Sequence, residues 1–147
     1  MPTVDIRHSI SGKILHSVEV PQPRPLFPCD LSGLTILNAD LRGADLVGAD
    51  LRGTVLIGCD LREANLQRAK MCGCDIRYTN LAGADLSGAL LENADSYPLN
   101  ADKKTRFLYA RIDSGSELEM LRNEIAEAKR WKDYRPKQFL IPWVVNL

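Results

Sequence analysis

The chain has 147 residues, which is enough for one domain with a buried core. Hydrophobic residues make up 45% and charged residues 26%, as in ordinary soluble proteins. A net charge of zero argues against a general nucleic-acid binder and against a strongly acidic DNA mimic. No apolar run is long enough to span a membrane and no signal peptide is recognisable, so we expect a cytoplasmic protein.

The N-terminal segment predicts a β-hairpin. Apolar and polar residues alternate on both sides of a Ser-Ile-Ser-Gly turn within residues 3–20. The two histidines, His8 and His16, lie here, and we interpret them as surface residues of the hairpin. Four prolines in residues 21–28 then form a stiff connector. We therefore assign residues 1–28 to an N-terminal cap.

Residues 29–96 are dominated by a repeat of five residues. Each repeat has a large apolar centre, often with Asp or Asn directly before it and Gly two positions after it. A small residue stands two positions before every centre except Ile36, which Leu34 precedes. The thirteen centres are Leu31, Ile36, Leu41, Leu46, Leu51, Leu56, Leu61, Leu66, Met71, Ile76, Leu81, Leu86 and Leu91.

A period of five fits neither a helix nor a simple strand. In a helix, five residues advance about 500°, so the centres would drift over every face. In a strand, an odd spacing would place successive centres on opposite faces. A coil that turns a corner every five residues points every centre inward, and Asp, Asn and Gly favour such corners. Four sides make a coil of 20 residues, and stacked coils form a solenoid.

The A(D/N)LxG pattern of residues 29–95 resembles the pentapeptide-repeat family. The resemblance implies a mainly β fold, a right-handed quadrilateral parallel β-helix, of about 3–3.5 coils here. Similar hairpins precede some bacterial and phage members, so the N-terminal hairpin fits the resemblance. The family hosts varied roles, and the resemblance therefore implies a fold more strongly than a function.

The cysteines and aspartates are explained by the repeat. Cys29, Cys59 and Cys74 occupy small inward positions on three different sides, so they predict buried thiols rather than a disulfide, and Cys72 points outward. Ligands that diverge in this way do not form a zinc site. The aspartates recur because corners need them, and no catalytic motif is present. We predict no metal, no cofactor and no enzymatic activity.

One side of the solenoid should carry an exposed apolar patch. Stacking by 20 residues aligns Thr35 and Leu37 with Val55 and Ile57, all pointing outward. Soluble monomers seldom leave such a patch bare, so another part of the chain, a second copy or a protein partner should cover it. The next side pairs Asp and Arg in a small charge ladder, which we interpret as support for solubility and register.

The repeat pattern ends by Tyr97–Pro98, and residues 97–147 are expected to form a C-terminal cap. Residues 106–112 fit a strand or a short helix, and we favour the strand. Residues 116–135 predict a helix that starts with a capping box of Ser116 and Glu119 and ends before Pro136. Its apolar stripe consists of Leu118, Leu121, Ile125 and Ala128. The helix and the apolar tail after it either cap the last coil, cover the patch, or join two chains.

These features favour a non-catalytic scaffold that mediates protein–protein interaction. Its partner would be another protein or a second copy, held by the patch or the C-terminal tail, with no small-molecule substrate, nucleic acid or membrane. The alternative, which rests on the resemblance alone, is a DNA-mimicking protein that interacts with or protects a topoisomerase, DNA gyrase. The candidate interaction residues are Thr35, Leu37, Val55, Ile57, Tyr78 and Trp143.

Overall fold

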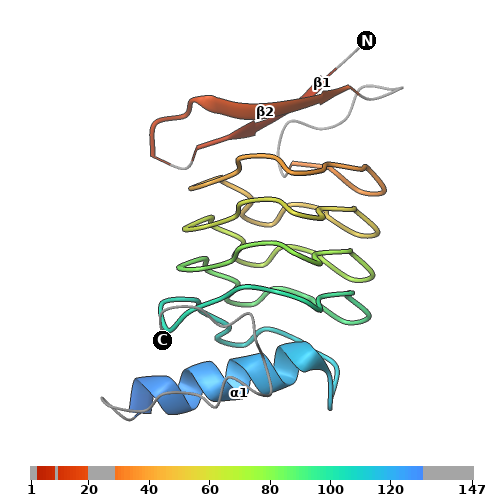
Figure 1. The fold of residues 1–147 in the computed structure, drawn as a ribbon. Coiled ribbons are helices and arrows are strands. Elements are labelled where there is room, and N and C mark those ends of the chain that lie inside the picture. The colour runs from red at the N-terminus through yellow and green to blue at the C-terminus, as the bar shows by residue number, and fades with distance from the viewer. Residues whose placement is uncertain (1–2, 9, 20–28, 131–147) are drawn as a thin grey trace.

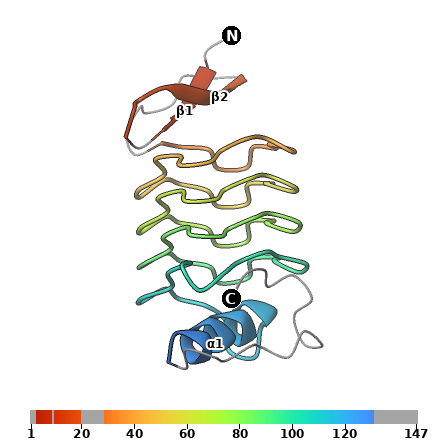
Figure 2. The same ribbon diagram turned by 60° about the vertical axis from the view of Figure 1, so that its left-hand side comes forward.

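The computed structural model describes residues 3–8, 10–19 and 29–130, which form a stack of flat coils between two caps (Figure 1). A hairpin of β1 (Thr3–Arg7) and β2 (Ile14–Glu19) lies at one end of the stack. Helix α1 (Glu117–Arg130) lies across the other end, as the rotated view also shows (Figure 2). The coils between them carry the five-residue repeat.

Parallel backbone bridges join each coil to the next. They fall in four columns, which begin with the pairs Asp30–Asp50, Thr35–Val55, Asp40–Asp60 and Asp45–Asn65. Partners in these first pairs are 20 residues apart, as the sequence predicts. Each side of a coil is short, so one bridged residue per side, rather than a longer strand, hydrogen-bonds to the neighbouring coil.

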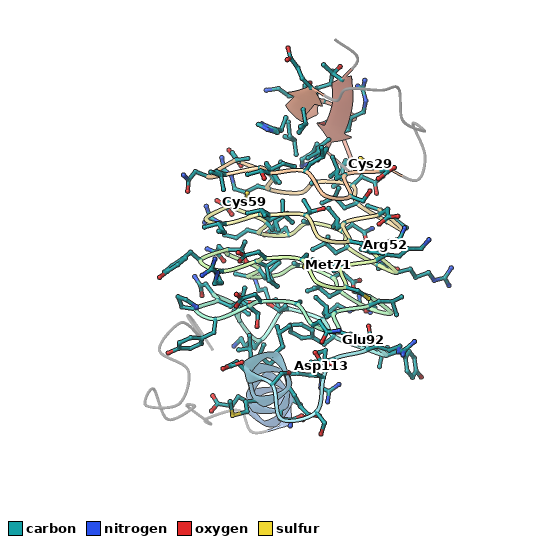
Figure 3. All side chains as sticks on the ribbon, turned by 90° about the vertical axis from the view of Figure 1, so that its right-hand side faces the viewer. Cys29, Arg52, Cys59, Met71, Glu92 and Asp113 are labelled. Carbon is teal, nitrogen blue, oxygen red and sulfur yellow. The ribbon has the colours of Figure 1, made fainter. Side chains whose placement is uncertain are left out.

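The repeat positions have the orientations that the sequence predicts. Every centre from Leu31 to Leu91 is at most 2% exposed, and burying one such side chain contributes about 1.5–3 kcal/mol. The residue before the centre turns the corner: the Asp50 carboxylate, for example, accepts a hydrogen bond from the Arg52 amide at 3.2 Å. Gly53 then adopts a positive φ of 65°. Figure 3 shows Met71 within the stack and Arg52 on its outside.

The ladder continues beyond residue 96, where the sequence predicts the end of the repeats. Asn80 bridges Asn100, and the last pairs are Asp85–Arg106 and Leu90–Arg111. Residues 97–111 therefore belong to the stack rather than to a separate cap, and the predicted boundary is wrong. The predicted strand at 106–112 is instead two bridged sides of a coil. The predicted coil count is not confirmed, and the right-handed sense stays a prediction.

The hairpin closes one end of the stack, as predicted. Strand β1 pairs antiparallel with β2, and Ile6, opposite His16, is buried in the solenoid core. The Arg7 carbonyl accepts a hydrogen bond from the Asp45 amide at 2.6 Å. The C-terminal end of β1 is therefore hydrogen-bonded to the first coil. The predicted connector at 21–28 lies outside the described residues.

Helix α1 closes the other end. Leu118, Leu121 and Ile125 are at most 2% exposed and belong to the same core cluster as the last coil residues. One half of the predicted capping box is confirmed, because the Glu119 amide donates to the Ser116 hydroxyl at 3.2 Å. The Glu119 carboxylate accepts from the Gly115 amide, one residue before the expected Ser116 amide. The helix thus caps the stack within one chain. The predicted helix residues 131–135 lie outside the described part.

Two glycines with nearly the same φ angle test how closely the hairpin packs on the first coil. Gly43 and Gly53 have φ of 66° and 65°, but a Cβ at Gly43 would lie 2.5 Å from His8 Nε2, whereas a Cβ at Gly53 would meet nothing within 4 Å. We expect Gly53→Ala to cost about 1–2 kcal/mol for the left-handed backbone. Gly43→Ala should cost about 1–3 kcal/mol more, measured by urea unfolding.

The histidine ring cannot move aside without loss, because His8 Nδ1 accepts hydrogen bonds from the Ile10 and Ser11 amides, both at 3.2 Å. We therefore expect His8→Ala to reduce the extra cost of Gly43→Ala in a double-mutant cycle. Equal losses for the two glycine variants would show that the hairpin is not seated on Gly43 in solution.

The buried face of α1 provides a second test. Leu121→Ala should lower the free energy of unfolding by about 2–5 kcal/mol, because it leaves a cavity between the helix and the last coil. Met120→Ala, on the adjacent and 42% exposed side chain, should change it by no more than about 0.5 kcal/mol. Similar small effects for both variants would contradict capping by α1.

Candidate interaction surface

The four patch residues predicted from the sequence lie together on one side of the solenoid. Thr35 forms a backbone bridge with Val55. Next to Leu37, the Asn38 amide donates to the Ile57 carbonyl at 3.0 Å, so Leu37 lies above Ile57. Leu37 is 55% exposed and Thr35 is exposed, whereas Val55 and Ile57 are half-buried. The apolar patch is therefore centred on Leu37. Helix α1, which lies at the opposite end of the stack, does not cover it (Figure 1).

Of the other two candidate residues, the structure describes only Tyr78, which lies one coil further on: the Gly58 amide, next to Ile57, donates to the Arg77 carbonyl, next to Tyr78, at 3.1 Å. Tyr78 stands at a corner with φ of 59°, is 61% exposed and lines a small hollow with Asn80 and Pro98. Trp143 lies outside the described residues. The role of all six residues as an interaction surface stays a prediction.

The charged side next to the patch is an ordered set of ion pairs. Asp40 and Arg42 form two side-chain hydrogen bonds, from Nε at 2.8 Å and from Nη2 at 2.6 Å. The hydrogen bonds from Arg42 hold the pKa of the Asp40 carboxyl down at about 2. Asp60 and Arg62 repeat this pair one coil on, and Arg42 also lies 3.8 Å from Asp60. The predicted charge ladder is confirmed.

The four cysteines are free thiols, as the repeat predicts. Burial raises the pKa of Cys74 to about 12, and burial followed by the nearby Asp30 charge raises the pKa of Cys29 to about 11. The Cys59 thiol donates to the Ile36 carbonyl at 3.3 Å. These thiols are protonated and poorly nucleophilic at neutral pH.

Cys72 faces outward, and its Sγ lies 3.4 Å from a Glu92 carboxylate oxygen. Desolvation and the hydrogen bond to Glu92 raise the pKa of the thiol. Glu92 in turn pairs with Arg111 at 2.8 Å. The 20-residue spacing places Glu92 directly beneath Cys72, and the structure adds that their side chains turn toward each other.

The described residues contain no group of three or more His, Cys, Asp or Glu side chains placed to hold a metal ion. Within the same ranges, no helix is both long and apolar enough to cross a membrane. The described surface instead carries the apolar patch, the ion pairs, the small hollow beside Tyr78 and a second hollow beside α1.

That hollow, of about 310 Å³, was not anticipated from the sequence. It lies between the last coil, which contributes Phe107, Leu108 and Tyr109, and α1, which contributes Ile125. A signal for the extra coil does exist, since small Thr105 stands two positions before Phe107 and the same spacing recurs at residues 110 and 112. Nothing in the local pattern marks the hollow itself.

The four-sided stack defines the class of the protein as a parallel β-helical solenoid. The sequence matches the family model of Pentapeptide repeats (8 copies) at residues 39–77 and 54–93. The solved structure of alr5209, a pentapeptide repeat protein from Nostoc Pcc 7120, is 32% identical. It aligns over 57% of this chain and 76% of that chain, with a TM-score of 0.53. The chain therefore belongs to the pentapeptide repeat family.

Two other solved structures are less similar. HetL, a pentapeptide repeat protein involved in heterocyst differentiation regulation from Nostoc sp. Strain PCC 7120, is 31% identical over 58% of this chain and 46% of that chain, with a TM-score of 0.43. QnrB1, a plasmid-mediated fluoroquinolone resistance protein, is 20% identical over 65% and 64%, with a TM-score of 0.28. Among curated proteins, no sequence matches this chain significantly. Pentapeptide repeat proteins are generally non-catalytic.

The Asp40–Arg42 pair has a measurable signature. We expect the Asp40 carboxyl to titrate near pH 2 in the native protein and near 3.9 in Arg42→Gln, by NMR of the carboxyl carbon. Because the folded pKa is the lower one, the pair stabilises the fold above about pH 4, and this contribution is lost as the pH falls toward 2. Arg52→Gln, which removes the partner of Asp50, serves as the control. A native midpoint near 3.9 would contradict a persistent pair.

Proposed function

We propose that this protein is a non-catalytic scaffold that binds a protein partner through the patch of Thr35, Leu37, Val55 and Ile57. The observation that carries the proposal is the 55% exposure of Leu37 on a side whose backbone is fixed by the ladder. An exposed leucine that stands singly needs no explanation, but a contiguous apolar patch marks an interaction surface. The four free cysteines suit a reducing compartment, and we propose that the interaction takes place in the cytoplasm.

The patch is suited to binding because it is rigid and apolar. Ile36 and Asn38, on either side of Leu37, both donate backbone hydrogen bonds to the next coil, at 2.7 and 3.0 Å. Little backbone entropy remains to be lost when a partner binds here. We expect a partner that presents an aliphatic or aromatic side chain to the space between Leu37 and Ile57.

The alternative, a DNA-mimicking partner of a topoisomerase, has less support. A DNA mimic needs carboxylates spaced along a surface without compensating cations. In this chain the carboxylates of Asp40, Asp50, Asp60 and Asp75 each lie within 2.7 Å of the arginine two residues later. Their charge is therefore neutralised locally, and we keep the protein-binding patch as the proposal.

The experiment compares two patch variants with a matched control. Leu37→Asp and Ile57→Asp place a charge in the patch, while Val47→Asp places the same charge on a half-buried aliphatic residue of another side. The immobilised wild-type protein captures partners from an extract of the cells in which it naturally occurs. The purified partner is then titrated against the wild type and each variant. We expect both patch variants to weaken binding by about 30-fold or more and Val47→Asp to leave it unchanged.

Light scattering of the same variants identifies a second copy as the occupant. A dimer of the wild type that dissociates in Leu37→Asp would assign the patch to self-association. A partner that binds Leu37→Asp and Ile57→Asp as tightly as the wild type would overturn the proposal. Far-UV circular dichroism confirms that each variant is folded.

A further inference from the structure

The hollow beside α1 leaves large apolar side chains uncovered by the described chain. Leu108 is 56% exposed and Tyr109 is 85% exposed, and both line the hollow with Phe107 of the same coil. Tyr109 also occupies a left-handed corner, with φ of 58°, where the repeat usually places glycine. A bulky residue is costly in that conformation, and Leu108 and Tyr109 together leave a contiguous apolar surface exposed beside α1.

We propose that residues 139–145 of the same chain, Phe-Leu-Ile-Pro-Trp-Val-Val, occupy this hollow and cover Leu108 and Tyr109. The proposal concerns the end of the stack opposite the apolar patch and is independent of the proposed function. It assigns Trp143 to packing within the chain rather than to a partner.

The chain can reach the hollow from where α1 ends. The helix contributes Arg122, Ile125 and Ala126 to the lining, about one to two turns before its last residue, Arg130. Pro136 cannot lie inside a continued helix, so the chain leaves the helical path by about that point. Seven extended residues span about 23 Å, against about 21 Å for the 14 residues of α1. A returning segment is therefore long enough to follow the helix.

The chemistry of the hollow selects the apolar part of the tail. Two charged side chains line it and each already has a partner: Arg106 lies 3.4 Å from Asp85, and Arg122 lies 3.1 Å from Glu119. Residues 130–138 contain four basic side chains and one acidic one, and burying these charges against the apolar walls of the hollow is unfavourable. Residues 139–145 are uncharged, and the indole of Trp143 can stack on a guanidinium group.

Burial of this segment also removes an aggregation hazard. Seven consecutive uncharged, apolar residues would form a sticky surface if they remained in water. The walls of the hollow and the tail thus satisfy each other without a second molecule.

Tryptophan fluorescence tests the proposal on the full chain. The sequence has two tryptophans, so Trp131→Phe leaves Trp143 as the single reporter. We expect blue-shifted emission and an acrylamide quenching constant several-fold below that of the urea-unfolded protein. Tyr109→Gly in this background should raise quenching toward the unfolded value. The glycine suits the left-handed corner, so the variant keeps the coil folded.

Tyr78→Gly is the matched control, because Tyr78 is also an exposed tyrosine at a left-handed corner but does not line this hollow. It should leave Trp143 quenching unchanged. Free quenching of Trp143 in the parent, or no response to Tyr109→Gly, would overturn the proposal. Shielding that disappears on dilution, together with a dimer mass by light scattering, would assign the hollow to the tail of a second copy and would also overturn it.

Discussion

The structure depends on the parallel backbone ladder that holds each coil in register with the next. The Leu41 amide donates to the Asp60 carbonyl at 2.8 Å, and the Asp60 amide donates to the Ala39 carbonyl at 2.9 Å. This exchange fixes which residue lies under which, and therefore which side chains point inward. Buried leucines then stack on leucines, since any slip along the chain would turn apolar centres toward water. Register and core burial thus enforce one another.

The same constraint explains how the ladder tolerates an irregular coil. One additional residue separates Asn100 from the next bridged residue, Arg106, compared with the usual spacing of five. A turn absorbs it: the Asp102 carboxylate accepts from the Lys104 amide at 2.9 Å, and the Asp102 amide donates to the Thr105 hydroxyl. The Thr105 hydroxyl also donates to the Leu81 carbonyl of the coil above at 2.9 Å. The insertion is therefore confined to a corner while the core position at Thr105 stays buried.

A ladder has two open ends, and the two caps close them by different means. The hairpin closes the first coil with backbone hydrogen bonds and the buried Ile6 side chain, and its Leu15 and Val18 also pack against the core. Helix α1 cannot pair with a backbone edge and instead covers the last coil with an apolar stripe. Unpaired edges invite association with other chains, and the two caps cover both ends of the ladder.

The sequence alone determined the five-residue period, the inward positions, the corner residues, the hairpin and the start of α1, because each depends on contacts between near neighbours or on strict repetition. It also aligned Leu37 with Ile57, since a constant 20-residue spacing makes distant neighbours predictable. It failed where repetition failed, and residues 97–111 were assigned to a cap although they continue the ladder. Only the tertiary structure decided that α1 lies across the last coil and that a hollow forms beside Tyr109. Those contacts join elements whose separation in the chain follows no repeat, so their geometry is set by packing in three dimensions.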